Sequence, residues 1–272
     1  MHIGIDLGGT KTESIIIDQN GKEIERLRKD TPKNYNGTID TICDLVSHLE
    51  KKFQKNCKIG IGTPGALSNE TNCIKGGNST WLNGRPLKKD IELRLNREIY
   101  LENDANCFAL SEAIDGAAKN YNVVFGIIMG SGTGGGIVIN KKIIKGANYL
   151  SGEWGHLPLP IFGKLNDKKF IKNKISMMQI QKFTSGKGLE KLYNKKITAR
   201  EIFDKSDKFT KSIFIKHFKI RLSRALVNLI YTIDPDAIVF GGGLSNEIKS
   251  LNEIKNMVIK NMEIKNLNTK FL

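Results

Sequence analysis

The sequence has no apolar run near the ~20 residues that a membrane-spanning helix needs. Its first residues, Met-His-Ile-Gly-Ile-Asp, lack the basic start and long apolar core of a signal peptide. Its 4 cysteines in 272 residues are scattered and form no Cys-x-x-Cys pair. This pattern indicates neither a disulfide framework nor a four-thiolate zinc site. Together these absences predict a cytoplasmic protein that does not bind a membrane.

Acidic residues are also few relative to basic ones. The chain has 28 Asp and Glu against 43 Lys and Arg, which gives a net charge of +15. Such a charge attracts polyanions in general. The lysines are spread along the whole chain, however, and no arginine-rich arm or basic helix stands out. The pattern therefore predicts a solvated basic surface rather than a specific nucleic-acid site.

The length permits one large domain or two modest ones, and the first half alternates strands with helices. Three strands separated by short turns are expected at the N-terminus, and they indicate an antiparallel meander. Apolar residues then recur at three- and four-residue spacing up to Phe53, which predicts a helix. Further elements are a strand at 58–62, a loop-rich segment at 68–86 and a helix at 87–96.

The second half repeats this layout. It is expected to open with a strand at 123–129, a glycine-dense turn at 130–136, and strands at 137–139 and 142–145. A long helix at 209–233, a strand at 237–240, a helix at 245–260 and a polar tail follow. Alternating strands and helices predict an α/β protein. The duplicated layout predicts two lobes, residues 1–104 and 105–272.

Asp104 stands where an apolar strand at 99–101 stops and a helical segment at 105–118 begins. At such a junction its carboxylate lies near unpaired backbone N–H groups, which favour the ionised form. An ionised aspartate in a cleft can accept a proton from a substrate hydroxyl. The alternative is that Asp104 only caps the helix.

Three glycine-rich turns follow strands, at 6–11, 130–136 and 241–243. Glycine lets backbone N–H groups approach an anion closely, and Asp6 could hold a magnesium ion through water. The turn at 130–136 fits neither a Walker motif nor a dinucleotide fingerprint. Glycines that merely close hairpins are the alternative for each turn taken alone. The pair of matching turns in the two halves favours phosphate binding.

These motifs occur in an order that resembles the ROK sugar kinases, of the actin-like ATPase superfamily. They are Asp6-Leu-Gly-Gly-Thr-Lys11, Thr63-Pro-Gly65, Asn103-Asp-Ala-Asn106, residues 130–136, Gly152-Glu-Trp-Gly-His156 and residues 241–243. Residues 78–84 and 152–160 look most similar to bacterial fructokinases. The resemblance implies a two-lobe actin-like (ribonuclease H-like) α/β fold with mixed sheets flanked by helices.

The resemblance also implies transfer of the γ-phosphoryl group of ATP, with Mg²⁺, to the primary hydroxyl of a hexose. Asp104 would be the general base. Fructose is the expected sugar, with glucose, mannose and N-acetylhexosamines left open. The implied sugar-binding residues are Gly65, Asn78, Asn103, Glu153, His156 and Gln181. Those implied for the nucleotide are Asp6, Gly8, Gly9, Thr10, Lys11, Gly130, Gly132, Thr133, Gly134, Gly135, Gly242 and Gly243. A homodimer is possible, because dimers are common in the family.

The chain departs from the family at its zinc site. The positions of the family's three zinc cysteines become Lys172, Lys174 and Gln179. His156 alone cannot hold a structural zinc, which needs four ligands, so no zinc is expected. A sugar-binding glutamate becomes Gln181, whose bond lacks charge assistance. The chain also stops sooner after residues 241–243 than the family's kinases do.

Two other functions compete with an active kinase. The departures favour a degenerate sugar-binding pseudokinase. The family also includes sugar-responsive repressors, which carry a helix-turn-helix domain ahead of the kinase-like part. Because the glycine motif begins at Asp6, no such domain is expected here.

Overall fold

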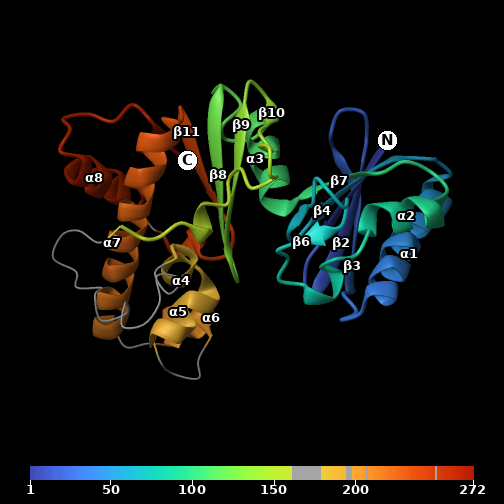
Figure 1. The fold of residues 1–272 in the computed structure, drawn as a ribbon, viewed down its shortest axis with the longest axis horizontal. Coiled ribbons are helices and arrows are strands. Elements are labelled where there is room, and N and C mark those ends of the chain that lie inside the picture. Colours follow the sequence, from blue (N-terminus) through green and yellow to red (C-terminus); the bar gives the residue numbers. More distant parts are fainter. Residues whose placement is uncertain (161–178, 194–197, 206–207, 249) are drawn as a thin grey trace. The chain divides into compact units, whose positions relative to one another are not determined.

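The computed structural model describes residues 1–160, 179–193, 198–205, 208–248 and 250–272. The chain forms two compact units (Figure 1). The first comprises Met1–Cys107 and Lys145–Leu150, and the second comprises Phe108–Ile144 and Ser151–Leu272. Lys145–Leu150 thus belongs to the first unit, although the second unit precedes and follows it in the sequence. The lobe boundary expected after Asp104 stays a prediction.

The first unit is built on a mixed five-stranded sheet of order β3-β2-β1-β4-β7. Its strands are β1 (His2–Leu7), β2 (Lys11–Ile17), β3 (Glu23–Asp30), β4 (Lys58–Thr63) and β7 (Tyr100–Asn103). The N-terminal meander is confirmed, because β1, β2 and β3 pair antiparallel in sequence order. Strands β4 and β7 run parallel to β1. The carboxyl ends of β1, β4 and β7 therefore share one edge.

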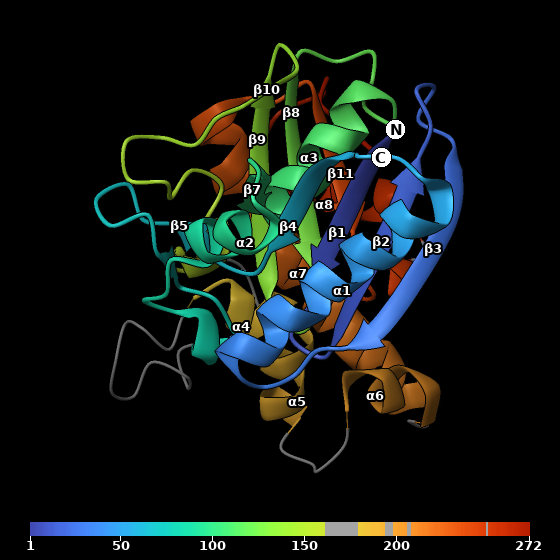
Figure 2. The same cartoon turned by 90° about the vertical axis from the view of Figure 1, so that its right-hand side faces the viewer.

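Helices α1 (Tyr35–Phe53) and α2 (Leu87–Leu95) cover one face of this sheet (Figure 2). That face is apolar because alternate residues of β1, Ile3, Ile5 and Leu7, point into the core. Asn34 caps α1 by accepting a hydrogen bond from the backbone N–H of Gly37. The segment expected to be loop-rich contains a small hairpin of β5 (Ala66–Leu67) and β6 (Ile74–Lys75), and a 3₁₀ turn at Thr80–Leu82.

The second unit has a five-stranded sheet of order β10-β9-β8-β11-β12. Its strands are β8 (Val123–Met129), β9 (Thr133–Ile139), β10 (Lys142–Ile143), β11 (Ala237–Gly241) and β12 (Lys270–Phe271). The glycine-dense turn was predicted too long, because β9 already begins at Thr133. In the polar tail, Lys270–Phe271 pairs with β11. A two-residue strand has no periodic signal, so only pairing with a neighbour reveals it.

Five helices complete the described part of the second unit, after α3 (Asp104–Ile114), which starts in the first. They are α4 (Gln181–Thr184), α5 (Gly186–Tyr193), α6 (Ala199–Lys205), α7 (Lys208–Ile233) and α8 (Leu251–Met262). The helix expected at 245–260 is in fact a 3₁₀ turn, Ser245–Glu247, followed by α8. Helix α8 starts late because the Ser250 hydroxyl accepts a hydrogen bond from the backbone N–H of Glu253.

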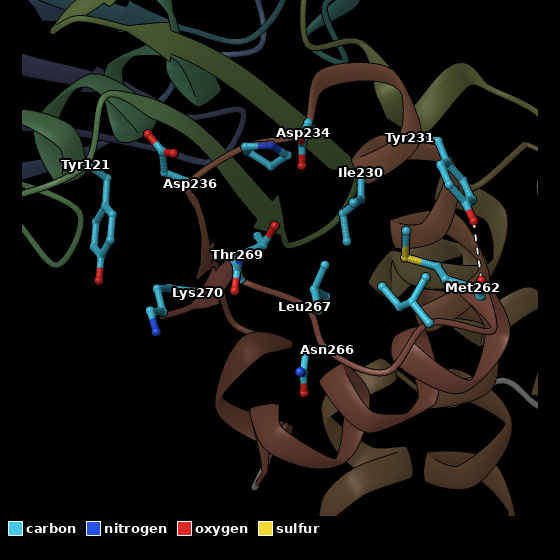
Figure 3. A pocket seen from close by; sticks show the side chains of 13 residues that line it. Tyr121, Ile230, Tyr231, Asp234, Asp236, Met262, Asn266, Leu267, Thr269 and Lys270 are labelled. Carbon is cyan, nitrogen blue, oxygen red and sulfur yellow. Dashed lines mark hydrogen bonds between the residues drawn. The ribbon is translucent and has the colours of Figure 1, made fainter.

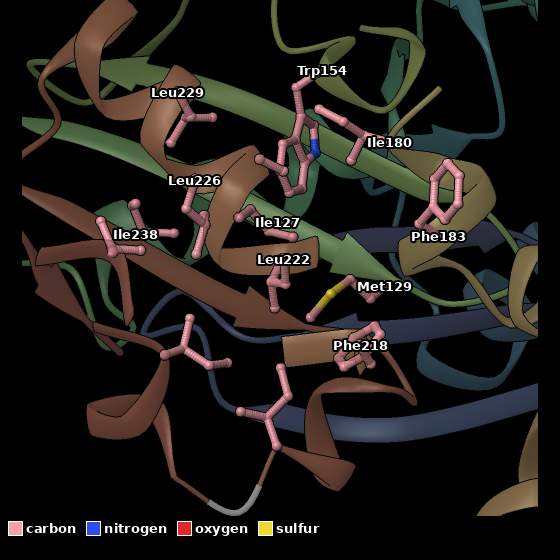
Figure 4. Packing of buried hydrophobic residues seen from close by; sticks show 14 of the residues in the cluster. Ile127, Met129, Trp154, Ile180, Phe183, Phe218, Leu222, Leu226, Leu229 and Ile238 are labelled. Atoms are coloured by element: carbon pink, nitrogen blue, oxygen red, sulfur yellow. The ribbon is translucent and has the colours of Figure 1, made fainter. Parts of the chain in front are cut away.

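The core of the second unit forms between α7 and the sheet (Figure 4). Phe218, Leu222 and Leu226 lie on one stripe of α7, as its periodicity predicts. They pack in one cluster with Ile127 and Met129 of β8. None of the described helices is long and apolar enough to cross a bilayer.

Candidate active site

The carboxyl edge of the first sheet brings together four residues that the sequence analysis singled out. Asp6 lies near the end of β1, Gly65 follows β4, and Asn103 and Asp104 end β7. Register places Asp6 opposite Gly62 and Thr63 opposite Asn103. Polar groups at this edge of parallel strands are typical of ligand sites in α/β proteins.

Asn103 organises the turn from β7 into α3. Its Oδ1 accepts hydrogen bonds from the backbone N–H groups of Ala105 (2.9 Å) and Asn106 (3.2 Å). Its Nδ2 donates to the carbonyl oxygen of Gly65 (2.9 Å). Asp104 Oδ1 also accepts from Ala105 N–H, at 2.8 Å. Capping is therefore shared, with Asn103 satisfying two N–H groups, and the role of Asp104 as general base stays a prediction.

Gly65 occupies a position that only glycine fits. Its φ is +85°, in the left-handed region, and a Cβ there would lie 2.5 Å from the carbonyl oxygen of Lys75. The turn therefore keeps its backbone close to the 75–77 segment while its carbonyl holds Asn103. Asn78, which follows that segment, is exposed.

The turn between β1 and β2 is held by backbone and threonine hydrogen bonds. Gly8 N–H donates to the carbonyl oxygen of Lys11 (3.0 Å). Thr31 N–H donates to Thr10 O (2.9 Å), and its hydroxyl donates to Gly8 O (2.8 Å). The buried hydroxyls of Thr12 and Thr31 lie 2.8 Å apart beneath the turn. The Lys11 ammonium pairs with Asp30.

The turn between β8 and β9 repeats this construction. Gly130 N–H donates to Gly132 O (2.9 Å), and Gly130 O accepts from Gly186 N–H (2.8 Å). Buried hydroxyls of Thr133 and Thr184 lie 3.0 Å apart. The duplication inferred from the sequence thus extends to the buried threonine pair under each turn.

The loop after β11 lies at the same edge of the second sheet as the turn between β8 and β9. Leu244 N–H donates to the carbonyl oxygen of Met129 (3.0 Å), directly before Gly130. A Cβ on Gly242 would lie 2.6 Å from that oxygen. The loop that begins at Gly242 therefore lies beside the end of β8, directly before Gly130, as expected from parallel pairing of β8 and β11.

Gly134 and Gly135 have a packing role within β9. A Cβ on Gly135 would lie 2.7 Å from the Phe125 ring and 2.8 Å from the Trp154 ring. These rings meet edge-to-face, with centroids 5.9 Å apart. The Trp154 indole N–H donates to the carbonyl oxygen of Gly134 (3.0 Å). Tight packing therefore explains Gly135 without a ligand, whereas its predicted role at the nucleotide is untested.

Glu153, His156 and Gln181 come together in the second unit. His156 Nδ1 lies 3.0 Å from Glu153 Oε2, across the 3₁₀ turn Trp154–His156. A Cβ on Gly155, within that turn, would lie 3.4 Å from Cβ of Gln181. Ile180 N–H donates to Leu157 O (2.9 Å), which joins the two segments. The imidazole and carboxylate are partly exposed and can reach a ligand.

Of the three positions that replace zinc cysteines, Gln179 pairs with Pro158 through a β-bridge. Lys172 and Lys174 lie outside the described residues. Within the described ranges, no group of three or more His, Cys, Asp and Glu side chains could hold a metal ion. The expected absence of zinc rests on the sequence and stays a prediction.

Negative charge gathers at the edge of the first sheet. Partial burial, then the Glu13 carboxylate on β2, raise the pKa of Asp6, while Arg28 opposes them. Burial, together with the carboxylates of Glu102, Asp104 and Asp6, raises the pKa of Cys107 to about 12. Cys107 is therefore a neutral thiol near pH 7 and is a poor nucleophile.

Sequence reasoning missed Glu102 and Lys145, whose side chains pair at 2.7 Å. Glu102 directly precedes the Asn-Asp motif and could have been suspected. Lys145 lies 43 positions further along, and nothing in the sequence relates it to Glu102.

A pocket of about 640 Å³ lies elsewhere, at the amino ends of the parallel strands β8, β11 and β12 (Figure 3). Tyr121, Asp234, Asp236 and Lys270 contribute to its walls. The Asp236 carboxylate already accepts hydrogen bonds from the backbone N–H groups of Asn122 (3.0 Å) and Val123 (2.8 Å). This is the edge opposite to the glycine turns, and we assign it no part in the candidate site.

Comparison with known proteins agrees with the motifs. Residues 2–271 match the ROK family. The N-acetyl-D-glucosamine kinase of Escherichia coli O127:H6 (strain E2348/69 / EPEC) is 35% identical over 259 residues, which are 90% of this chain and 85% of that protein. This identity over nearly the whole length establishes common family membership.

Solved structures share the fold at lower identity. A ROK family glucokinase from Streptomyces griseus, in complex with glucose and AMPPNP, has a TM-score of 0.79 and 22% identity, over 100% of this chain and 93% of that one. A ROK hexokinase from Thermus thermophilus has a TM-score of 0.77 and 22% identity, over 99% and 92%. The expected α/β fold, with mixed sheets flanked by helices, is confirmed. The chain belongs to the ROK family and has the fold of its sugar kinases.

Proposed function

We propose that this protein is an ATP-dependent hexose kinase that transfers the γ-phosphoryl group to a sugar hydroxyl. The observation that carries the proposal is the placement of Asp104. Asn103 and Gly65 hold the turn that presents its carboxylate at the first turn of α3. Phosphoryl transfer depends mainly on positioning and charge stabilisation. A fixed carboxylate that orients the sugar hydroxyl and accepts its proton, together with groups that hold the phosphates, would meet this requirement.

Sugar hydroxyls are proposed to bind Glu153, His156 and Gln181, with further contributions from Asn78, Asn103 and the Gly65 backbone. Asn103 uses Oδ1 and one amide hydrogen within the turn, so one amide hydrogen is left for a sugar hydroxyl. Glu153 can hold the His156 ring in a defined orientation through their 3.0 Å contact.

The nucleotide phosphates are proposed to bind the two glycine turns. One turn would contact the phosphates through Gly8, Gly9, Thr10 and Lys11. The other would do so through Gly130, Gly132, Thr133, Gly134 and Gly135, and the adenosine would lie near Gly242 and Gly243. The Asp6 residue is open to solvent although neighbouring groups partly bury its carboxylate, and it suits Mg²⁺, which prefers oxygen ligands and usually keeps several waters. Bound Mg²⁺ would neutralise charge on the phosphates. The burial and the neighbouring Glu13 that raise the pKa of Asp6 favour its neutral form, and a nearby cation would offset this.

For the acceptor we propose N-acetyl-D-glucosamine first. The support is the 35% identity to N-acetyl-D-glucosamine kinases over 90% of this chain. Fructose, favoured by motifs at 78–84 and 152–160, stays a prediction. The two sugars differ at C2, where one carries an acetamido group and the other a ketone, so a direct competition separates them.

The test measures ADP release with ATP, Mg²⁺ and a panel of N-acetyl-D-glucosamine, N-acetyl-D-mannosamine, glucose, mannose and fructose. We expect sugar-dependent turnover, with the largest kcat/KM for N-acetyl-D-glucosamine. A larger value for fructose would overturn the acceptor assignment and leave the kinase intact. Sugar binding by calorimetry without turnover on any sugar would instead support the pseudokinase, which Gln181 and the missing cysteines favour.

Replacing Asp6 with asparagine separates its function from stability. Because the folded state raises the pKa of Asp6, ionising this group costs stability as pH rises through the folded-state pKa. At neutral pH the variant should melt no lower than wild type, while activity at limiting Mg²⁺ falls about 10–100-fold. Thermal melts and Mg²⁺ titrations of the rate check both parts. A lower melting temperature with unchanged Mg²⁺ dependence would mean that Asp6 is structural.

A further inference from the structure

Glu102 connects the Asp104 turn to a distant part of the chain. Its Oε1 accepts hydrogen bonds from Asn103 N–H and from the Asn106 side-chain amide, both at 3.0 Å. Its Oε2 lies 2.7 Å from Nζ of Lys145. These contacts bracket Asp104, since Asn103 precedes it and Asn106 lies in the same first turn of α3.

The Asn106 amide depends on Glu102 for its orientation. Asn106 is only 7% exposed, and its Oδ1 is buried without a hydrogen-bond partner in the described part of the structure. The bond from its Nδ2 to Glu102 is therefore the contact that orients this side chain. If Glu102 moved, a buried amide in the first turn of α3 would lose its anchor, which is costly.

Lys145 begins the segment 145–150, which belongs to the first unit. Two hydrogen bonds attach this segment to that unit. Nζ of Lys75 donates to the carbonyl oxygen of Asn148 (2.9 Å), and the Asn69 amide donates to Ala147 O (3.4 Å). The Lys145 ammonium also lies 5.6 Å from the ring centre of Tyr149. The ion pair with Glu102 therefore joins two segments that each have their own attachments in this unit.

The Glu102–Lys145 ion pair also offsets negative charge around Asp104. The carboxylates of Glu102, Asp104 and Asp6 all act on the Cys107 thiol, while Lys145 acts on it with the opposite sign. Three carboxylates near one point repel one another. Without the ammonium, Glu102 would tend to swing towards solvent and release Asn106.

We propose that Glu102 and Lys145 are positioning residues, which hold the β7–α3 turn so that the Asp104 carboxylate keeps its productive orientation. The inference rests on the proposed kinase function and adds to it two residues and the 145–150 segment. Neither residue needs to touch substrate. Their effect should therefore appear in kcat, because small displacements of a catalytic group slow the chemical step strongly.

The experiment compares Lys145→Met, Glu102→Gln and the double variant. We expect kcat to fall about 10-fold or more in each single variant, with KM for the sugar changed less than about twofold. Because both residues act through one contact, the double variant should be no slower than the worse single variant. Lys145→Arg should restore most of kcat, since it keeps the charge.

Matched controls are Lys142→Met and Glu98→Gln, which make the same changes at exposed positions. They should retain wild-type kcat. The partly exposed ion pair alone contributes little to stability, and losing the Asn106 hydrogen bond costs about 1–3 kcal/mol, so Tm of the single variants should fall by no more than about 10 °C.

Two outcomes would overturn the inference. One is a wild-type kcat in both single variants, and the other is multiplication of their effects in the double variant, which would indicate independent roles. An inactive wild-type protein would defeat the proposed function instead. Limited proteolysis of the variants within 145–150 would then still report whether the Glu102–Lys145 pair anchors that segment.

Discussion

Asp104→Asn is expected to lower kcat for the sugar about 10²–10⁴-fold, the range that general acid–base groups contribute. The substitution removes the proton acceptor and keeps the size of the side chain. Its amide oxygen can still accept the hydrogen bond that Asp104 Oδ1 accepts from Ala105 N–H. Asn103 continues to satisfy two N–H groups of the turn. The loss should therefore be chemical, with the fold intact.

Steady-state kinetics with the best sugar of the panel measure this loss, and calorimetry shows whether the sugar still binds. Asp115→Asn is the matched control, because it makes the same change at an exposed position just beyond α3. The control should behave as wild type. A kcat within about threefold of wild type in Asp104→Asn would show that another group accepts the proton.

Trp154→Ala is expected to destabilise the second unit by about 3–5 kcal/mol, as for other large buried aromatics. Trp154 is 4% exposed and packs edge-to-face on Phe125. It also donates to Gly134 O. The variant leaves a cavity beside β9 and an unpaired carbonyl. Because Glu153 and His156 flank this residue, sugar affinity should fall as well.

Urea unfolding followed by circular dichroism measures the change. The chain has 2 tryptophans, so the fluorescence of Trp81 then reports the first unit alone. Its transition should not move if that unit unfolds independently. Trp154→Phe keeps most of the apolar volume and loses the indole N–H, so it should cost about 1–3 kcal/mol. Equal losses in both variants would mean that the hydrogen bond, and not packing, dominates.

Local patterns were sufficient for most helices and strands. The apolar stripes of α1 and α7 and the alternation in β1 are properties of neighbouring residues, so they can be read without the fold. Glycine-rich turns after β1, β8 and β11 were visible for the same reason. Element ends were less predictable, because Thr133 joins β9 only through its pairing with Met129.

The order of its motifs was enough to relate this chain to the ROK family, and the residues at the positions of the family's zinc cysteines predict that it holds no zinc. Tertiary structure decided which groups work together. It gave Asn103 the main capping role beside Asp104, and Gly135 a place against two aromatic rings. It also brought Lys145 to Glu102, across 43 positions of sequence. The physical reason is that a local pattern reports on residues one turn or one pleat apart, whereas burial, pairing and charge depend on whatever the folded chain brings within a few ångströms.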